Sequence, residues 1–299
     1  MKIKSIARNP YKVFSYLASR GAFKSLDDKL YLQLMYRARM GEKLNLENPI
    51  SFNEKMQWLK LNERKPLYTI LADKIEMREY LSSIIGDQYL VPLIGIWDTP
   101  DQIDFENLPE KFVIKCNHNS GLGMCICTDK NTLDFDLVRK DLMRGLNEDY
   151  YLHFREWPYR DIRRRIICEK YLTDESGYEL KDYKVFVLSG EAKYVQVDYD
   201  RFTDHHRNFY DSTWTYVPFT TLYPTNPDRT IEKPQKLNEM LEIAEFIANK
   251  TGLESFVRID FYAIYESLYI GEITMFHGSG YEPFFPSEYD VRLGRMIKI

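Results

Sequence analysis

The spacing of apolar residues along this 299-residue chain changes from helical to strand-like after the first third. Asp27 is placed to cap the first predicted helix, and Ser51 with Glu54 forms the sequence of a capping box before the second. Gly86 follows the third as a helix-ending residue. Apolar residues at helical spacing therefore predict helices over 27–40, 54–61 and 73–85.

Strand signals dominate the remainder of the chain. A polar, aromatic-rich excursion over 199–234 interrupts them, and a further helix is predicted over 237–251, ending at Gly252. Because the strands are segregated from the helices without strict alternation, the pattern predicts an α+β architecture. The predicted strands are 89–96, 111–115, 124–128, 166–172, 183–188, 192–198, 256–264 and 268–274.

The last two strands are predicted to form a hairpin around a polar turn. A turn centred on Glu266 places Asp260 opposite Glu272. The same register places Arg258 opposite Thr274, with all four side chains on one face. Like charges that face each other destabilise a hairpin, so the two acids invite a divalent cation, and oxygen ligands suit Mg²⁺. The alternative is an exposed hairpin with two solvated acids.

Composition narrows the class of protein. A hydrophobic fraction of 44% and a charged fraction of 29% are typical of a globular protein with one large or two moderate domains. The net charge of −4 gives no argument for a nucleic-acid partner, and none is predicted. No apolar run reaches the ~18–20 residues of a transmembrane helix, and no signal peptide is visible. The four cysteines lack the spacing of a zinc site, and their apolar surroundings predict reduced core residues of a cytosolic protein: Cys116, Cys125, Cys127 and Cys168.

The first 26 residues contain six basic residues and no acid. A basic amphipathic segment can lie on an anionic membrane surface, which would place the protein at the inner face of the membrane. The alternative is a solvated helix that packs its apolar stripe on its own domain. The basic residues are Lys2, Lys4, Arg8, Lys12, Arg20 and Lys24, and the apolar residues between them include Ile3, Ile6, Val13, Phe14, Tyr16 and Leu17.

A lysine and a glycine-containing loop form a first candidate for anion binding. Lys115 ends a predicted strand. Gly121 and Gly123 in the following loop allow backbone angles at which amide N–H groups converge on an anion. The loop is not a P-loop, because no Gly-Lys-Ser/Thr follows and the next element is a strand. An ordinary hairpin turn is the alternative.

Charged residues also occur in strands of the buried type. Glu169 and Lys170 lie in the apolar strand 166–172, where a charged pair needs partners. Asp182 and Lys184 begin the next strand and can reach the same cleft. A strand that leaves the core with Glu169 exposed is the alternative.

In their order along the chain, these residues resemble the ATP-grasp superfamily, which includes D-alanine–D-alanine ligase. More closely, the chain resembles the TupA-like ATP-grasp family, which is associated with bacterial surface-polysaccharide gene clusters. The superfamily pattern consists of Asp73-Lys74, Lys115 with its loop, the stretch 169–172, Asp182, Arg258 with Asp260, and the stretch 272–275. The narrower resemblance extends over residues 9–280 and is carried by 51–58, 72–80, 111–118 and 200–203.

The resemblance implies an ATP-grasp fold, in which two α+β subdomains clamp the nucleotide, with a helical N-terminal extension. The implied cofactors are ATP and Mg²⁺. The implied parts are a helical N-terminal region over 1–72, a pre-ATP-grasp segment over 73–109, a central lid subdomain over 110–172 and a C-terminal subdomain with the metal site over 173–299.

The resemblance also implies roles for single residues in nucleotide binding. Lys74 and Lys115 would contact the ATP phosphates, and the loop 117–123 would fold over them. Glu169 would bind the adenine amino group, and Asp182 would hold the ribose. The implied nucleotide-binding residues are Lys74, Lys115, Asn117, Ser120, Gly121, Gly123, Glu169, Lys170, Leu172, Asp182 and Lys184.

The implied metal ligands are Asp260, Glu272 and Thr274, and the first two agree with the register of the predicted hairpin. Thr274 stands where family relatives commonly have asparagine, and its hydroxyl is a weaker ligand than an amide carbonyl. Arg258 and Lys115 are the implied catalytic residues. Arg258 would stabilise an acyl phosphate or a tetrahedral intermediate.

Substrate contacts are expected from a polar segment that follows the strands. Arg201 and Arg207 can hold a substrate carboxylate or a transferred phosphate through the planar fork of the guanidinium. His205 and His206 are not expected to bind a metal together, because adjacent side chains of an extended chain point in different directions. The histidines interpreted as local hydrogen-bond partners rather than catalytic bases are His118 and His277.

The residues and the resemblance together predict an ATP-dependent carboxylate–amine ligase. Mg²⁺-ATP would phosphorylate a carboxylate to an acyl phosphate, which an amine then attacks to form an amide. The resemblance implies that the carboxylate, as a small molecule or linked to a glycan, belongs to a uronic or amino-acid component of a surface polysaccharide. The alternatives are a nucleotide-sugar-dependent glycosyltransferase of the same pathway and a nucleotide-binding protein without activity.

Overall fold

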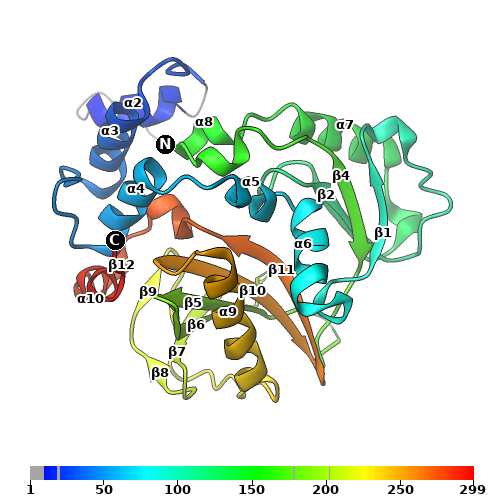
Figure 1. Cartoon of the computed structure of the whole chain (residues 1–299). Helices are drawn as coiled ribbons and strands as arrows, with labels where there is room; N and C mark the ends of the chain where they lie inside the picture. The colour runs from blue at the N-terminus through cyan, green and yellow to red at the C-terminus, as the bar shows by residue number, and fades with distance from the viewer. Residues whose placement is uncertain (1–9, 19–20, 178, 202) are drawn as a thin grey trace.

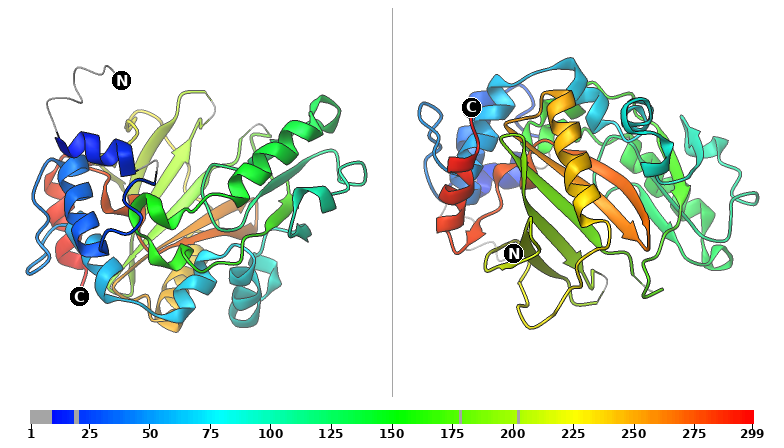
Figure 2. Two further views of the ribbon diagram at one scale, coloured as in Figure 1. Left: turned by 90° about the horizontal axis from the view of Figure 1, so that it is seen from above. Right: turned by 60° about the horizontal axis from the view of Figure 1, so that its bottom comes forward.

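The computed structural model of the chain describes residues 10–18, 21–177, 179–201 and 203–299. Within these ranges two large antiparallel sheets lie side by side, and helices from both ends of the chain gather at one end of the larger sheet (Figure 1). Each sheet has one face covered by a helix (Figure 2). The predicted α+β architecture is confirmed.

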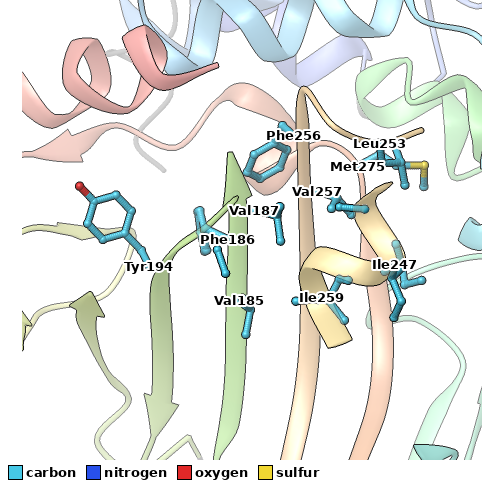
Figure 3. Close-up of a cluster of buried hydrophobic side chains, with 14 of the residues drawn as sticks. Val185, Phe186, Val187, Tyr194, Ile247, Leu253, Phe256, Val257, Ile259 and Met275 are labelled. Atoms are coloured by element: carbon cyan, nitrogen blue, oxygen red, sulfur yellow. The ribbon is translucent and has the colours of Figure 1, made fainter. Parts of the chain in front are cut away.

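The larger sheet has six strands in the order β11-β10-β5-β6-β7-β8, and alternate residues of each strand point to opposite faces. Val187 lies opposite Val257, and these two pack with Ile247 of the covering helix (Figure 3). On the other face, Lys184 lies opposite Asp260. The strands and the covering helix are β5 (Asp182–Leu188), β6 (Glu191–Tyr199), β7 (His206–Asp211), β8 (Tyr216–Val217), β10 (Phe256–Ile264), β11 (Ser267–Thr274) and α9 (Leu237–Thr251).

The smaller sheet has four strands in the order β1-β4-β2-β3 and its own core. Ile114 and Cys168 face this core together with Leu142 of the covering helix. Lys115 and Glu169, one residue further along each strand, point to the opposite face. The elements are β1 (Leu93–Trp97), β2 (Phe112–Cys116), β3 (Met124–Cys127), β4 (Ile166–Lys170) and α7 (Phe135–Leu146).

The first helices form a third cluster. Phe14 and Ala18 are buried against Tyr31 and Leu32, so the apolar stripe of the first described helix packs on its own domain. This is the alternative that the sequence left open for the basic segment, of which residues 1–9, 19 and 20 lie outside the described ranges. The helices are α2 (Pro10–Ala18), α3 (Asp28–Met40) and α4 (Phe52–Asn62).

Two of the predicted helix starts are confirmed in detail. The Asp27 side chain accepts a hydrogen bond from the amide of Leu30, as expected of an N-cap. Ser51 and Glu54 exchange both bonds of a capping box. None of the helices in the described ranges is long and apolar enough to cross a membrane.

Several elements were not predicted. The excursion over 199–234 contains three short strands, because polar residues such as Arg207 and Asn208 are buried in β7 by partners elsewhere in the chain. The third predicted helix, 73–85, is observed as α6 (Glu76–Ile85), which begins three residues later than expected, and a separate helix, α5 (Pro66–Ala72), precedes it. The elements outside the prediction are α5, α7, α8 (Tyr151–Phe154), α10 (Glu288–Met296), β7, β8, β9 (Thr220–Thr221) and β12 (Phe284–Phe285).

Short 3₁₀ turns connect these elements and bring loops onto the two sheets. The last of them follows β11 and leads to β12, which pairs with β9. These turns are η1 (Asp87–Tyr89), η2 (Pro100–Gln102), η3 (Lys130–Thr132), η4 (Trp157–Tyr159) and η5 (His277–Gly280).

Candidate active site

A cavity of about 760 Å³ is lined by the charged faces of both sheets. Lys115 and Glu169 come from the smaller sheet, and Asp260 and Glu272 come from the larger one. Three predicted site residues do not line it: Asn117, Gly123 and Thr274. The predicted residues that do are Lys74, Lys115, Ser120, Gly121, Glu169, Lys170, Leu172, Asp182, Lys184, Arg201, Arg207, Arg258, Asp260 and Glu272.

The predicted opposition of Asp260 and Glu272 is present in the structure, and Arg258 lies opposite Thr274. The turn differs from the expectation. Ile264 pairs with Ser267 across a two-residue turn, and the register shifts by one residue between Asp260 and Phe261. This β-bulge restores the register that a longer turn was expected to give.

Asp260 is held by two cations. Arg258 donates to both of its oxygens, at 2.6 and 2.8 Å, and Lys184 donates to Oδ2 at 2.6 Å. Burial opposes ionisation of Asp260, but Arg258 and Lys184 outweigh it and lower the pKa of this carboxyl. Lys184 also donates to Asp182, whose pKa burial raises. Asp260 is therefore an anion at neutral pH.

The carboxylates fit a magnesium ion that shares its coordination sphere with phosphates and water. Glu272 keeps a partly exposed carboxylate, 3.9 Å from both Lys74 and Arg258. Oδ1 of Asp182 is buried without a hydrogen-bond partner among the described residues. No three histidine, cysteine or acidic side chains within the described ranges form a metal cluster. Mg²⁺ usually takes one or two protein carboxylates and completes its shell with phosphate oxygens and water, which matches this donor set.

Thr274 has no geometric support as a metal ligand. Its hydroxyl accepts a hydrogen bond from Arg258 Nη2 at 3.0 Å, and the residue is buried outside the cavity. The short threonine side chain therefore binds its neighbour on the sheet instead of extending into the cavity.

The two predicted phosphate lysines both line the cavity. Lys74 donates to the carbonyl of Asn119 at 2.8 Å, and burial lowers its pKa. Lys115 contacts Glu169 at 2.8 Å. Arg78, which the sequence analysis did not assign to the site, contacts the other oxygen of Glu169 at 2.9 Å. Two cations thus flank the carboxylate of Glu169 at the cavity wall.

The loop after Lys115 divides into buried and exposed parts. Asn117 is buried and donates to Asp73 at 2.8 Å and to the carbonyl of Arg163 at 2.9 Å, so it joins separate segments instead of facing a ligand. Gly121 has a φ of +94° and lines the cavity. Gly123, at the end of the loop, does not line the cavity, and a Cβ there would come within 2.9 Å of Gly145 Cα.

The two predicted substrate arginines differ in their freedom. Arg207 is buried and donates to Asp198 at 2.7 Å, to Thr221 at 2.9 Å and to Glu282 at 3.3 Å. Arg201 has a side chain that is 45% exposed, and among the described residues its one ion pair is with Asp182, at 3.4 Å. Of these two arginines, Arg201 has the guanidinium that is more available to a ligand.

The histidines behave as the sequence analysis expected. His205 stacks on Tyr223 with ring centroids 3.6 Å apart, whereas His206 stacks on Tyr199, so the two rings face different sides. His118 donates from Nε2 to the carbonyl of Glu148 at 3.1 Å, and burial lowers its pKa to about 4. His205 and His206 are therefore not arranged to bind one metal ion, and His118 is not placed as a general base.

Solved structures with similar folds include ligases. D-alanine–D-alanine ligase from Helicobacter pylori is 15% identical over 83% of this chain and 69% of its own, with a TM-score of 0.40. The Bacillus anthracis enzyme complexed with ATP is 15% identical over 69% of this chain and 54% of its own, with a TM-score of 0.39. L-amino acid ligase from Bacillus licheniformis is 13% identical over 80% of this chain and 51% of its own, with a TM-score of 0.45.

This chain therefore spans little more than half the length of two of these three proteins. A comparison with curated protein sequences finds no match. The sequence model of the TupA-like ATP-grasp family matches residues 54–298. ATP-grasp enzymes are ATP-dependent carboxylate–amine ligases that use ATP with Mg²⁺. With most of its length matched, the chain belongs to the TupA-like ATP-grasp family.

Proposed function

We propose that this protein joins a carboxylate to an amine at the expense of ATP. The observation that carries the proposal is the pairing of Asp260 with Glu272 beside Arg258, across one cavity from Lys115 and Glu169. Anionic groups that can hold Mg²⁺ and cationic groups that can hold phosphates thus line one cavity. This arrangement suits phosphoryl transfer, in which the protein mainly positions the reactants and stabilises charge.

The proposed reaction has two steps. An oxygen of the substrate carboxylate attacks the γ-phosphorus of ATP, ADP leaves, and an acyl phosphate forms. The amine nitrogen then attacks the carbonyl carbon, inorganic phosphate leaves, and the nitrogen loses a proton as the amide forms. Mg²⁺, held by Asp260 and Glu272, would supply positive charge to the phosphate oxygens.

The side chains of this chain would have distinct tasks. Lys74 and Lys115 would neutralise the phosphates. To do so, Lys115 would leave Glu169 and contact the phosphate oxygens instead. Glu169, still held by Arg78, would then accept a hydrogen bond from the adenine amino group. Arg258 would face the charge that develops on the acyl phosphate and the tetrahedral intermediate.

We further propose that the carboxylate is a uronic or amino-acid component of a surface polysaccharide, free or linked to a glycan. Arg201 supports this proposal for the carboxylate itself, because its guanidinium is exposed at the cavity and has one long ion pair. The proposed location is the cytoplasmic face of the membrane, where the basic segment 1–26 would meet anionic lipid.

The first test is a thermal-shift titration of the full chain with Mg²⁺ plus ATP and, separately, with Mg²⁺ plus UDP-sugars. A ligand that binds only the folded state raises stability by roughly 2.7 kcal/mol at a hundredfold excess over its dissociation constant. We expect stabilisation by Mg²⁺-ATP and none by UDP-sugars. Stabilisation by UDP-sugars alone would favour the glycosyltransferase.

A variant on the hairpin tests the metal site. Glu272→Gln keeps the size of a partly exposed side chain, so the variant should fold. We expect Mg²⁺-dependent ADP release to fall by about a hundredfold or more, because the variant loses a metal ligand and with it the positive charge that Mg²⁺ supplies to the phosphates. Glu266→Gln, an exposed position on the same hairpin, is the matched control and should keep full turnover. Near-normal ADP release from Glu272→Gln removes the proposed metal site.

A further inference from the structure

A buried imidazole lies behind Arg258. His277 is 2% exposed, and its ring packs edge-on against Phe52 and Phe186. Nδ1 of His277 is 2.8 Å from Arg258 Nη1, and Nε2 is 3.5 Å from Glu282. Because a guanidinium can only donate, Nδ1 must accept, and the proton of the neutral ring lies on Nε2.

The turn that carries this histidine is fixed from α4. Gly278 and Ser279 both have a φ of +53°, which is unfavourable for the serine. Gln57 donates to the carbonyl of Ser279 at 2.9 Å and Lys60 donates to it at 2.7 Å. An unfavourable backbone conformation is thus held in place by two buried side chains of one helix.

Lys60 shows how strongly this turn is constrained. The residue is 1% exposed, and burial lowers the pKa of its amine. Its other acceptors are Gln57 at 3.1 Å and the carbonyl of Phe154 at 3.0 Å. A buried amine lowers stability unless it is fully bonded. These bonds join α4 to the last residue of α8 and to the turn that follows His277.

Building on the proposed function, we propose that His277 is a positioning residue that directs the guanidinium of Arg258 into the cavity. The other hydrogen-bond partners of Arg258 are Asp260 and Thr274, and Glu272 lies 3.9 Å away. Asp260 and Glu272 are also the proposed metal ligands, so their attraction for Arg258 competes with their binding of the cation. A neutral imidazole fixes the guanidinium without cancelling the positive charge that acts on the developing anion.

Two matched variants separate this role from packing. His277→Phe keeps an aromatic ring but removes the acceptor, whereas His277→Asn places an amide oxygen where Nδ1 was and removes the ring. We expect kcat to fall by about tenfold to a hundredfold in His277→Phe, with the KM for ATP changed by less than about twofold. His277→Asn should keep most of kcat even if its melting temperature is lower. If kcat instead follows the melting temperature in both variants, His277 is structural only.

A spectroscopic test does not depend on turnover. In the ¹⁵N NMR spectrum of the labelled full chain, the resonances that disappear in His277→Asn belong to His277. We expect the shifts of a neutral ring protonated on Nε2 with Nδ1 accepting. A ring protonated on Nδ1, or on both nitrogens, overturns the inference whatever the turnover. Absence of Mg²⁺-ATP binding by the wild type together with the expected tautomer would instead refute the proposed function alone.

Discussion

Two arginines of one cavity show how neighbours decide what a side chain can do. Arg207 already donates to Asp198, Thr221 and Glu282, so a substrate anion would have to displace buried partners. Leaving those partners unpaired costs more than a new bond returns. Arg201 loses little when it binds a ligand, because its side chain is 45% exposed. The proposed substrate contact therefore rests on Arg201.

The buried histidine beside the loop predicts a pH dependence of stability. Burial lowers the pKa of His118 from 6.5 to about 4. As the pH falls below about 6.5, the unfolded chain binds a proton that the folded chain does not bind until about pH 4. We expect the free energy of unfolding to decrease over this range, by up to about 3 kcal/mol, and to be unaffected by His118 above it.

Urea titrations at several pH values measure this effect. His118→Gln keeps an N–H donor for the carbonyl of Glu148 and does not titrate, so the difference between wild type and variant isolates the histidine. The wild type should lose more stability than the variant between pH 6.5 and pH 4. Parallel losses would show that His118 takes up its proton equally in both states.

For single residues, the sequence predicts which types occupy the site better than it predicts where their side chains point and which partners they bind. The opposition of Asp260 and Glu272 followed from strand periodicity, although a bulge and a shorter turn produce it. Thr274 was placed on the correct face, but its bond to Arg258 depends on side-chain length and orientation. Nothing in the sequence near Lys60 indicated its buried role, because its acceptor, the carbonyl of Ser279, is 219 residues away.

Among the elements, the contact between the loop after β2 and α7 is closer than side chains allow. Gly123 has a φ of +66°, and a Cβ there would lie 2.8 Å from Cys116 Sγ and 2.9 Å from Gly145 Cα. The two glycines therefore let the loop and the helix meet backbone to backbone. Since the loop also provides Gly121 to the cavity, this contact sets the distance of the loop from the proposed phosphate site.

Gly123→Ala tests this contact. We expect it to lower the free energy of unfolding by about 2–5 kcal/mol, because the left-handed conformation and the overlap with α7 both oppose a methyl group. Gly121→Ala is the matched control, since its φ is +94° but nothing lies within 4 Å of its Cβ. It should lose only about 1–2 kcal/mol. Equal losses in chemical denaturation would show that α7 yields to the methyl group.

Elements with a regular pattern were predictable, and those fixed by distant partners were not. Helix α9 was predicted with its observed bounds, because its apolar spacing and the terminal Gly252 are both local signals. Strand β7 was missed, because Arg207 and Asn208 look like surface residues until Asp198 and Asn226 satisfy them. The strand propensity of the local sequence does not depend on such distant partners and therefore cannot predict them.

The whole molecule places the proposed site between two separate cores. The larger sheet packs with α9 and the smaller sheet with α7, and the cavity is lined by the opposite face of each. Neither sheet carries all the residues proposed for nucleotide and metal. The predicted boundaries of the four parts of the chain stay predictions.

Membrane contact is a prediction that concerns the whole molecule. The apolar stripe of α2 already packs on α3, so it is not free to enter a membrane. Attraction to a membrane would then be electrostatic, with about 1 kcal/mol from each basic residue near an anionic surface. We expect the full chain to bind anionic vesicles at low salt and to leave them at high salt. A chain lacking residues 1–26 should bind less. The proposal fails if both chains partition equally.

The bulged hairpin also has a consequence for the order of folding. Asp260 and Glu272 are twelve residues apart and joined by a two-residue turn, and hairpins of this kind form in about 1–10 μs. In the smaller sheet, β2 and β3 also form a hairpin, but the pairing of β1 with β4, such as Leu93 with Glu169, closes a much longer loop, and we expect it to form later. We therefore expect the two acids to meet before the smaller sheet, which forms the other wall of the cavity, is complete. Arg258, on the same strand as Asp260, offsets their repulsion during that interval.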